Sequence, residues 1–415
     1  MKRFIKKWTE SSLIIKILIG VIIGVILGIY APNLKFIAFP GDIFVNALKA
    51  IAPILVFVLV ASAISKAKTG IGNKFKTVII FYMFSTLLSA IIAVIASYLF
   101  PVTINLANVG VQKAPEDIGK VISDMILMIF SNPIQLLSQG HYLGILFWAI
   151  VFGIALKMIA SDTTKDVLSD LADSITLIVR GIIQFAPIGI MGLVFSSVSK
   201  SGVGIFAQYG QLIMLLVGCV ALVTFVINPI IIAGALRRNP FPLVFTCLKE
   251  SGITAFFSRS SAANIPVNMN LCDRLGLDRD FYSISIPLGA AINMEGAAIT
   301  ITVMTLTVCH TMGISVPLPI AAVLCIISTL AACGASGVAG GSLMLVPMAC
   351  SMFGIGTDVA MQAVAVGFII GVIQDSCETA LNSAGDALFS ATAEYYNRRK
   401  AGEPMNYMGE FAKGD

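Results

Sequence analysis

The sequence predicts an all-α, polytopic membrane protein, on three observations. Of its 415 residues, 57% are apolar and 12% are charged, whereas a soluble domain carries about 25% charged residues. The apolar residues gather in runs of roughly 20, the length at which a helix crosses a bilayer. Two further apolar regions are interrupted by small and polar residues. We therefore expect eight transmembrane helices and two re-entrant helical hairpins, and an ordinary soluble enzyme is excluded.

The expected spans follow one another along the chain. The first, 13–31, is longer than the apolar core of a signal peptide, which has about 7–15 residues, so we interpret it as a retained helix. A shorter apolar stretch at 121–131 is expected to be an interfacial or bent lead-in to the fourth span. The other seven expected spans are 43–65, 77–100, 143–160, 174–200, 209–236, 281–312 and 358–393.

Lysine and arginine collect in alternate connections, before span one and after spans two, six and eight. These residues mark the cytoplasmic side of a membrane protein, so both termini are predicted to be cytoplasmic. They form no continuous surface stripe, which argues against a nucleic-acid partner despite the net charge of +5. The clusters are Lys2, Arg3, Lys6 and Lys7; Lys66, Lys68, Lys74 and Lys76; Arg237 and Arg238; and Arg398, Arg399 and Lys400.

Metal-cofactor and nucleotide chemistry finds no support in the sequence. The eight cysteines include no CxxC pair, and the chain has only two histidines, so no ligand set for zinc, haem or an iron–sulfur cluster is present. We expect the cysteines to be small buried apolar residues. A Walker loop is also absent, which argues against an ATP-driven pump.

Two apolar regions, 243–270 and 317–353, fit no straight span. Their centres are rich in small and polar residues, at 258–264 and 331–342. A small-residue tip between two half-length apolar arms predicts a hairpin that enters the membrane and turns back. Flexible surface loops are the alternative, which the apolar arms argue against. Each hairpin precedes a span, so the order hairpin–span occurs twice. An odd number of crossings separates the starts of the two units, which predicts inverted repeats. This arrangement is typical of transporters that bind substrate and ions near the midplane.

Polar residues interrupt spans seven and eight. The run Asn293–Ala298 breaks span seven, and an unwound turn with a carboxylate suits Na⁺, although a simple kink is the alternative. On the last span, five polar residues form one stripe roughly 16 Å long at 100° and 1.5 Å per residue. Carboxylates at bilayer depth indicate function rather than a purely structural network. The stripe comprises Asp375, Glu378, Thr379, Asn382 and Asp386.

These motifs together make the chain resemble the dicarboxylate/amino acid:cation symporter family, and within it the bacterial serine/threonine:Na⁺ branch. The residues that carry the likeness, over essentially the whole chain, are Arg259–Ser261, Ile265–Met269, Pro287–Met294, 334–342 and Gln374–Ser383.

The resemblance implies a glutamate-transporter-like fold and a homotrimer in the lipid of the cytoplasmic (inner) membrane. Residues 1–236 would hold spans one to six with the trimerisation scaffold, spans three and six joining the transport domain. Residues 237–397 would form the core of that domain, which moves as an elevator, and 398–415 would be a cytoplasmic tail.

The resemblance also implies roles for individual residues. Asp375 would hold the substrate amino group, Asn382 with Ser260 and Ser261 the carboxylate, and Thr379 would lie beside the substrate side chain. One Na⁺ site would use Asp386 with backbone carbonyls of Gly289, Asn293 and Asn382. A second would use backbone near Ala291, Ala332, Cys333 and Ala335, and a third Tyr82, Ser85, Thr86, Asn293 and Glu295.

Two positions depart from the acidic-substrate members of the family. Glu378 stands where those members place an arginine, which disfavours acidic substrates and favours L-serine and L-threonine. Glu295 replaces the usual aspartate and leaves the third Na⁺ site open. We therefore expect a Na⁺-coupled serine/threonine symporter rather than an enzyme. An acidic amino acid or dicarboxylate symporter, a proton-coupled neutral amino acid symporter, and a membrane enzyme or channel remain the alternatives.

Overall fold

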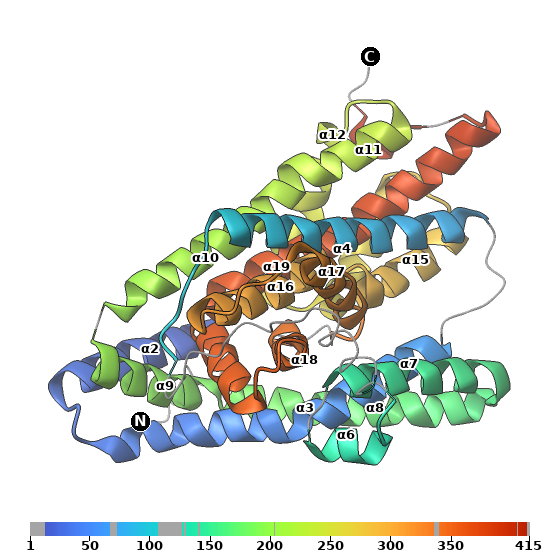
Figure 1. Ribbon diagram of the computed structural model, residues 1–415. Coiled ribbons are helices and arrows are strands. Elements are labelled where there is room, and N and C mark those ends of the chain that lie inside the picture. Colours follow the sequence, from blue (N-terminus) through green and yellow to red (C-terminus); the bar gives the residue numbers. More distant parts are fainter. Residues whose placement is uncertain are drawn as a thin grey trace, which may run out of the picture.

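The computed structural model describes residues 13–66, 73–106, 127, 130–139, 142–202, 204–335, 340–404 and 406–412. Within these ranges every regular element is a helix, which confirms the predicted all-α class. The helices fall into two groups that lie side by side (Figure 1).

The first group contains the helices before residue 202 other than α4. Within it, α2 packs along α9, and α3 packs against α7, α8 and α9. Small residues allow the close approach of α2 to α9, since a Cβ at Gly20 would lie 2.2 Å from the Pro187 carbonyl oxygen. The helices are α2 (Leu13–Tyr30), α3 (Phe39–Lys66), α6 (Pro133–Gln139), α7 (Tyr142–Ile159), α8 (Asp162–Gln184) and α9 (Ala186–Ser201).

The fifth expected span, 174–200, is not one straight helix. Helix α8 begins at Asp162, and the chain bends by 54° at Phe185 before α9 continues. Pro187 in the first turn of α9 has no N–H to donate to a continuing helix, which favours a new helix start there. The first turns of α8 carry charged residues, so a search for apolar runs did not include them in the expected span. Their charged residues are Asp162, Lys165, Asp166, Asp170 and Asp173.

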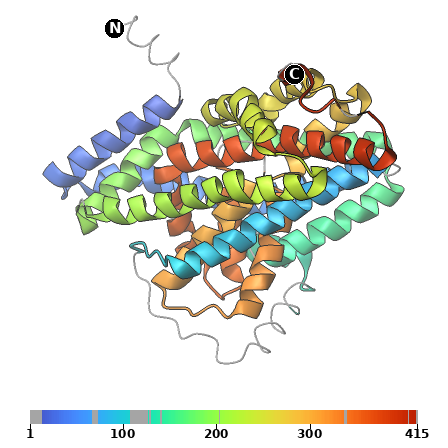
Figure 2. The same cartoon turned by 90° about the horizontal axis from the view of Figure 1, so that it is seen from above.

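The second group contains α4 and the helices after residue 204. Figure 2, turned by 90°, shows α10 and the long α19 crossing this part of the molecule. Helices α10 and α11 are joined by the π-helical turn η2 (Val223–Ile227), and α15 and α16 meet at a break at Asn293. The helices are α4 (Asn73–Leu99), α10 (Ile205–Leu222), α11 (Asn228–Leu236), α15 (Arg279–Ile292), α16 (Glu295–Thr311) and α19 (Thr357–Ala401).

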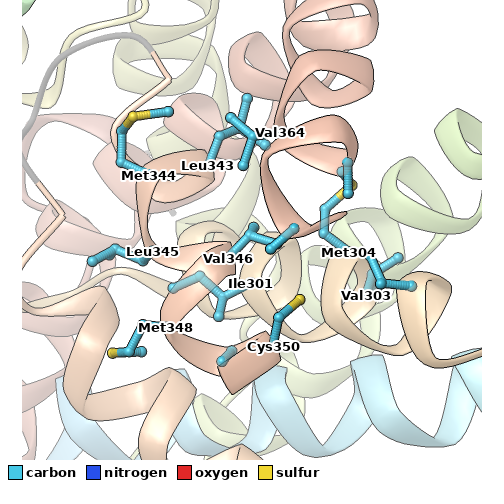
Figure 3. Packing of buried hydrophobic residues seen from close by; sticks show 14 of the residues in the cluster. Ile301, Val303, Met304, Leu343, Met344, Leu345, Val346, Met348, Cys350 and Val364 are labelled. Carbon is cyan, nitrogen blue, oxygen red and sulfur yellow. The ribbon is translucent and has the colours of Figure 1, made fainter. Parts of the chain in front are cut away.

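Both regions expected to form hairpins contain two helical arms. In the first, α12 (Phe241–Cys247), the π-helical turn η3 (Leu248–Gly252) and α13 (Ile253–Ser258) lead to a tip at 259–260, and α14 (Ser261–Arg274) returns. In the second, α17 (Leu318–Ala332) is followed by η4 (Ser342–Leu345) and α18 (Val346–Ser351). Figure 3 shows residues of this second arm packed against Ile301 and Met304 of α16 and Val364 of α19.

The number of membrane crossings stays a prediction. Among the described residues five helices are long and apolar enough to cross a membrane, or six if α8 and α9 count as one bent span, while α2 and α17 are shorter apolar helices. Most of the expected lead-in at 121–131 lies outside the described residues.

Apolar contacts join the two groups. The rings of Phe44 on α3 and Phe368 on α19 meet edge to face with centroids 5.1 Å apart. A Cβ at Gly334, just after α17, would lie 2.4 Å from Val60 Cγ2 on α3. The second hairpin and α19 therefore rest against α3.

Candidate functional site

The polar stripe predicted on the last span is buried in α19. Its five residues are between 0% and 6% exposed, although they lie in a helix that is otherwise largely apolar. Helices α13 and α14 pack on this helix from one hairpin, α18 from the other, and α16 packs beside them. The stripe thus faces both hairpins and the broken helix.

Asp375 is the point at which the two hairpin tips meet. Its Oδ2 lies 2.6 Å from Arg259 Nε at the first tip, and its Oδ1 accepts a hydrogen bond of 3.0 Å from the Gly340 backbone N–H at the second. Arg259 has a φ of 53° and Gly340 a φ of 77°, so both tips turn through left-handed backbone. The carboxylate for which the resemblance implies contact with the substrate amino group therefore already pairs with a cation of the protein.

The first hairpin presents a helix N-terminus next to this carboxylate. Ser260 caps α14, because its Oγ accepts a hydrogen bond of 3.3 Å from Ala263 N, and Ser261 is the buried first residue of the helix. Asn264 and Asn268 then fix α14 to α19 through bonds of 3.1 and 2.9 Å to Ser383 Oγ and its carbonyl oxygen. An N-terminus held in this way offers backbone donors to an anion.

Glu378 connects the second hairpin to α16 and α19. Its Oε2 accepts hydrogen bonds from Thr300 Oγ1 at 2.7 Å, Ser342 Oγ at 2.8 Å and Gln374 Nε2 at 2.6 Å. Thr379, the next residue, donates its hydroxyl to the Asp375 carbonyl oxygen in its own helix at 2.7 Å. Glu378, which shares the polar stripe with Asp375, thus also contacts Ser342 at the end of the second hairpin tip.

Asn382 and Asn293 hold α19 against the break between α15 and α16. Asn382 Oδ1 accepts a 2.7 Å hydrogen bond from the backbone N–H of Gly296, and its carbonyl oxygen accepts one of 3.1 Å from Asn293 Nδ2. Within the described ranges, Asn382 Nδ2 has one hydrogen-bond acceptor, the weak acceptor Met294 Sδ at 3.5 Å. Its amide N–H groups therefore remain suited to a stronger acceptor.

Asp386 is buried, and one of its two carboxylate oxygens has a hydrogen-bond partner among the described residues. Its Oδ1 accepts a 3.1 Å hydrogen bond from Asn293 Nδ2, whereas Oδ2 has no hydrogen-bond partner among the described residues. A Cβ at Gly289 would lie 2.9 Å from Asp386 Oδ1, so α15 approaches the carboxylate closely. The Tyr82 hydroxyl lies 3.1 Å from the Asp386 carbonyl oxygen. The structure therefore brings together Asp386, Gly289, Asn293 and Asn382, whereas ion binding by these residues stays a prediction.

Glu295 is a second buried carboxylate near the same break. Its Oε2 accepts a hydrogen bond of 3.2 Å from Asn228 Nδ2, and its Oε1 has no partner in the described part of the chain. Ser85 Oγ lies 3.5 Å from Asn293 Oδ1, and Thr86 donates to the Tyr82 carbonyl oxygen at 2.7 Å. A buried ionised carboxylate without compensation is costly, and a bound cation would supply that compensation.

The residues of the remaining expected site lie at the start of the second hairpin tip. Cys333 Sγ is 3.7 Å from the carbonyl oxygen of Ile292, the neighbour of Ala291. The carbonyl oxygen of Ala332 already accepts a 2.9 Å hydrogen bond from Ala335 N. The structure thus places this tip beside the end of α15, while 336–339 lie outside the described residues.

Several contacts of the site were not anticipated from the sequence. Arg259, Asn228 and Thr300 received no role, yet each binds a carboxylate of the stripe or of the break. An Asn within the apolar run 209–236 was a usable signal for Asn228. The partner of Arg259 depends on how the hairpin folds back, which sequence spacing does not reveal.

Comparison with known proteins agrees with this geometry. Proteins named serine/threonine transporter SstT match almost the full chain: that of Streptococcus thermophilus (strain ATCC BAA-250 / LMG 18311) is 55% identical over 97% of this chain and 100% of its own. The protein of Bifidobacterium adolescentis is 53% identical over 95% and 92% of the two chains, and that of Enterococcus faecalis 52% over 99% and 97%.

The family match covers the same region. Residues 13–395 fit the sequence model of the sodium:dicarboxylate symporter family, which includes both hairpins, the break and the polar stripe of α19. The resemblance inferred from the motifs is thereby confirmed, and membership of a symporter family makes this chain a transporter rather than an enzyme. The chain belongs to the sodium:dicarboxylate symporter family.

Proposed function

We propose that this chain is a Na⁺-coupled symporter that imports L-serine and L-threonine across the cytoplasmic membrane. The observation that carries the proposal is the identity of 52–55% over at least 92% of each chain to relatives named as serine/threonine transporters. The buried polar site at the meeting point of the hairpins supports it independently.

The substrate would bind between the two hairpin tips. Its ammonium group would replace the Arg259 guanidinium on Asp375, and its carboxylate would meet Asn382 Nδ2 and the N-terminus of α14 at Ser260 and Ser261. Burying a polar substrate requires that each of its groups finds such a partner. Thr379 follows Asp375 by one turn, which suits contact with a short side chain.

Glu378 supports neutral rather than acidic substrates. It is 6% exposed, and a substrate carboxylate placed next to it would add a second negative charge in a buried site. The hydroxyl of serine or threonine can instead donate a hydrogen bond to a carboxylate or accept one from the Thr300 hydroxyl. The same contact would disfavour an acidic amino acid or dicarboxylate as the substrate.

Na⁺ would bind at the break between α15 and α16. The unpartnered oxygens of Asp386 and Glu295 supply negative charge there, and the interrupted helix supplies backbone carbonyls, as a hard cation requires. Each Na⁺ that moves inward through 100 mV contributes about 2.3 kcal/mol to accumulation of the substrate, before its concentration gradient is counted.

Transport would proceed by movement of the second helix group along the first. The separate packing of α2, α3, α7, α8 and α9 supports an assignment of these helices to a static scaffold, with α4 and the helices after residue 204 as the moving domain. The apolar contact between the groups, at Phe44 and Phe368, suits sliding because it breaks no ion pair. We further propose a homotrimer and cytoplasmic termini.

The test is uptake of radiolabelled L-serine into proteoliposomes, with an inward gradient of Na⁺, K⁺ or H⁺, by the wild type and by Asp386→Asn. We expect uptake driven by Na⁺ alone and lost in the variant, since the amide removes the negative charge from the cation site. Serine uptake driven equally by H⁺ would replace the Na⁺ mechanism with proton coupling. Strong aspartate uptake without serine uptake would overturn the substrate assignment.

A further inference from the structure

A groove on the surface of the second helix group has no role in the proposed transport cycle. It lies between α4, α11 and the C-terminal end of α19, and its volume is about 820 Å³. Large apolar side chains line most of it, and several are strongly exposed: Ile80 (55%), Phe84 (48%) and Ile230 (63%). In a membrane protein such a surface faces acyl chains.

The length of the groove matches one leaflet. Along α4 it extends from Lys76 to Leu88, a rise of about 18 Å at 1.5 Å per residue. Half of a hydrocarbon core of about 30 Å is roughly 15 Å. One acyl chain of a single leaflet therefore fits along α4 and α11.

Positive charge is confined to one end of the groove. Lys76 at the start of α4 and Lys400 at the end of α19 line that end and are exposed. Neither forms an ion pair with the residues that the structure describes. Arg399 and Lys400 both approach the ring of Tyr396, at 5.7 and 5.8 Å from its centroid. This end thus lacks a counter-ion from the described protein.

The charged end lies on the side where anionic lipid is found. Lys76 and Lys400 belong to two of the basic clusters that the sequence assigns to the cytoplasm, and the cytoplasmic leaflet carries anionic phospholipids. A second groove of about 750 Å³, between α10 and the C-terminal end of α4, is lined by Phe100, Met214 and Leu222 and by no lysine or arginine. Of these two grooves, only the first combines an apolar lining with a basic end.

We propose that this groove binds one anionic phospholipid, with an acyl chain along α4 and α11 and the phosphate at Lys76 and Lys400. The argument uses neither the substrate nor the coupling ion, so it stands apart from the transport proposal.

The first test removes the charge. Purified protein is loaded with phosphatidylglycerol or phosphatidylcholine, and bound lipid is counted by native mass spectrometry. We expect the wild type to prefer phosphatidylglycerol, and Lys76→Gln/Lys400→Gln to reduce that preference by roughly tenfold or more, since each basic residue near an anionic surface contributes about fivefold. The matched control Lys165→Gln/Lys249→Gln removes the same charge elsewhere and should retain the preference. Equal preference in the first double variant and the wild type would overturn the proposal.

The second test fills the groove. A Cβ at Gly234, which lines it, meets no atom within 4 Å, so the side chain of Gly234→Leu starts in open space and is expected to occupy the groove. We expect this variant to lose the phosphatidylglycerol bound at this site and the thermal stabilisation that the lipid confers. Gly218→Leu is the control, because Gly218 lines the second groove and is equally unobstructed. Unchanged binding of phosphatidylglycerol by Gly234→Leu would contradict a lipid as the occupant of the groove. If the mass of the oligomer changed as well, the occupant would instead be a second copy of the chain.

Discussion

Asn228 and Glu295 show how one unanticipated side chain can control a predicted one. Asn228 follows the π-helical turn η2 directly, and it is 2% exposed. Its amide donates the hydrogen bond that Glu295 Oε2 accepts, at 3.2 Å. This donor holds Glu295 Oε2, while Oε1 has no partner among the described residues. We therefore infer that Asn228 is a positioning residue for the proposed cation site at Glu295.

We expect Asn228→Leu to weaken Na⁺ binding. A lost hydrogen bond to a buried charged group costs about 1.5–3 kcal/mol, which corresponds to roughly a tenfold to hundredfold higher half-saturating Na⁺ concentration in serine uptake. The control is Thr224→Val, a similar loss of polarity one turn earlier, where the hydroxyl bonds only to the Val220 carbonyl oxygen of its own helix. An identical Na⁺ dependence of Asn228→Leu and the wild type would rule out this role.

The residues of the site were predicted unequally, for a physical reason. Asp375, Asn382 and Asp386 lie in one continuous helix, so their common face followed from helical geometry. Contacts between elements, such as Arg259 with Asp375, depend on tertiary folding and were missed. The resemblance supplied roles for single residues, whereas the structure supplied their partners.

At the scale of the helices, the interruptions of regular helix differ in how well the sequence predicts them. The break at Asn293 was predicted from polar residues and glycine in an apolar run, and it lies where expected. The π-helical turns η2 and η3 could not be predicted in this way, because residues of the same types also occur in regular α-helices. The bend at Phe185 was missed because the charged start of α8 hid the true extent of the helix. Breaks marked by composition are thus predictable, and changes of hydrogen-bond register are not.

Gly385 of α19 allows this break to lie close to the helix. A Cβ there would lie 2.6 Å from Asn293 Nδ2 and 3.0 Å from Glu295 Oε2. We expect Gly385→Ala to displace both side chains and to reduce Na⁺-driven serine uptake at least tenfold. Gly371→Ala on the same helix is the control, since its Cβ would meet nothing within 4 Å, and uptake should stay near the wild-type level. Equal uptake by the two variants would show that the close approach at Gly385 is unimportant.

At the scale of the whole molecule, two helix groups meet through a surface of apolar side chains. Val60 of the first group and Gly334 of the second lie at this surface, and a Cβ at Gly334 would be 3.8 Å from the Val60 Cβ. That separation is typical of the two Cβ atoms in a disulfide, about 3.8 Å. The pair therefore offers a direct way to join the groups.

We expect oxidised Val60→Cys/Gly334→Cys to lose serine uptake and to regain it on reduction, because transport requires the groups to move past one another. Both variants are made with Cys333→Ala, which removes the neighbouring thiol. Gly252→Cys/Ala384→Cys, whose Cβ atoms would be 3.6 Å apart within the second group, should keep uptake when oxidised. Undiminished uptake by the fully cross-linked first pair would refute movement between the groups.

In the proposed transport cycle, the ion pair between Arg259 and Asp375 would make the arginine of the protein a competitor of the substrate. An amino acid would gain contact with Asp375 only where the guanidinium has left, so its apparent affinity would equal the intrinsic affinity multiplied by the fraction of molecules in that state. The same competition favours departure of the amino acid, since the returning arginine replaces it on the carboxylate. Such an arrangement would suit a carrier, because its turnover depends on substrate release as much as on substrate binding.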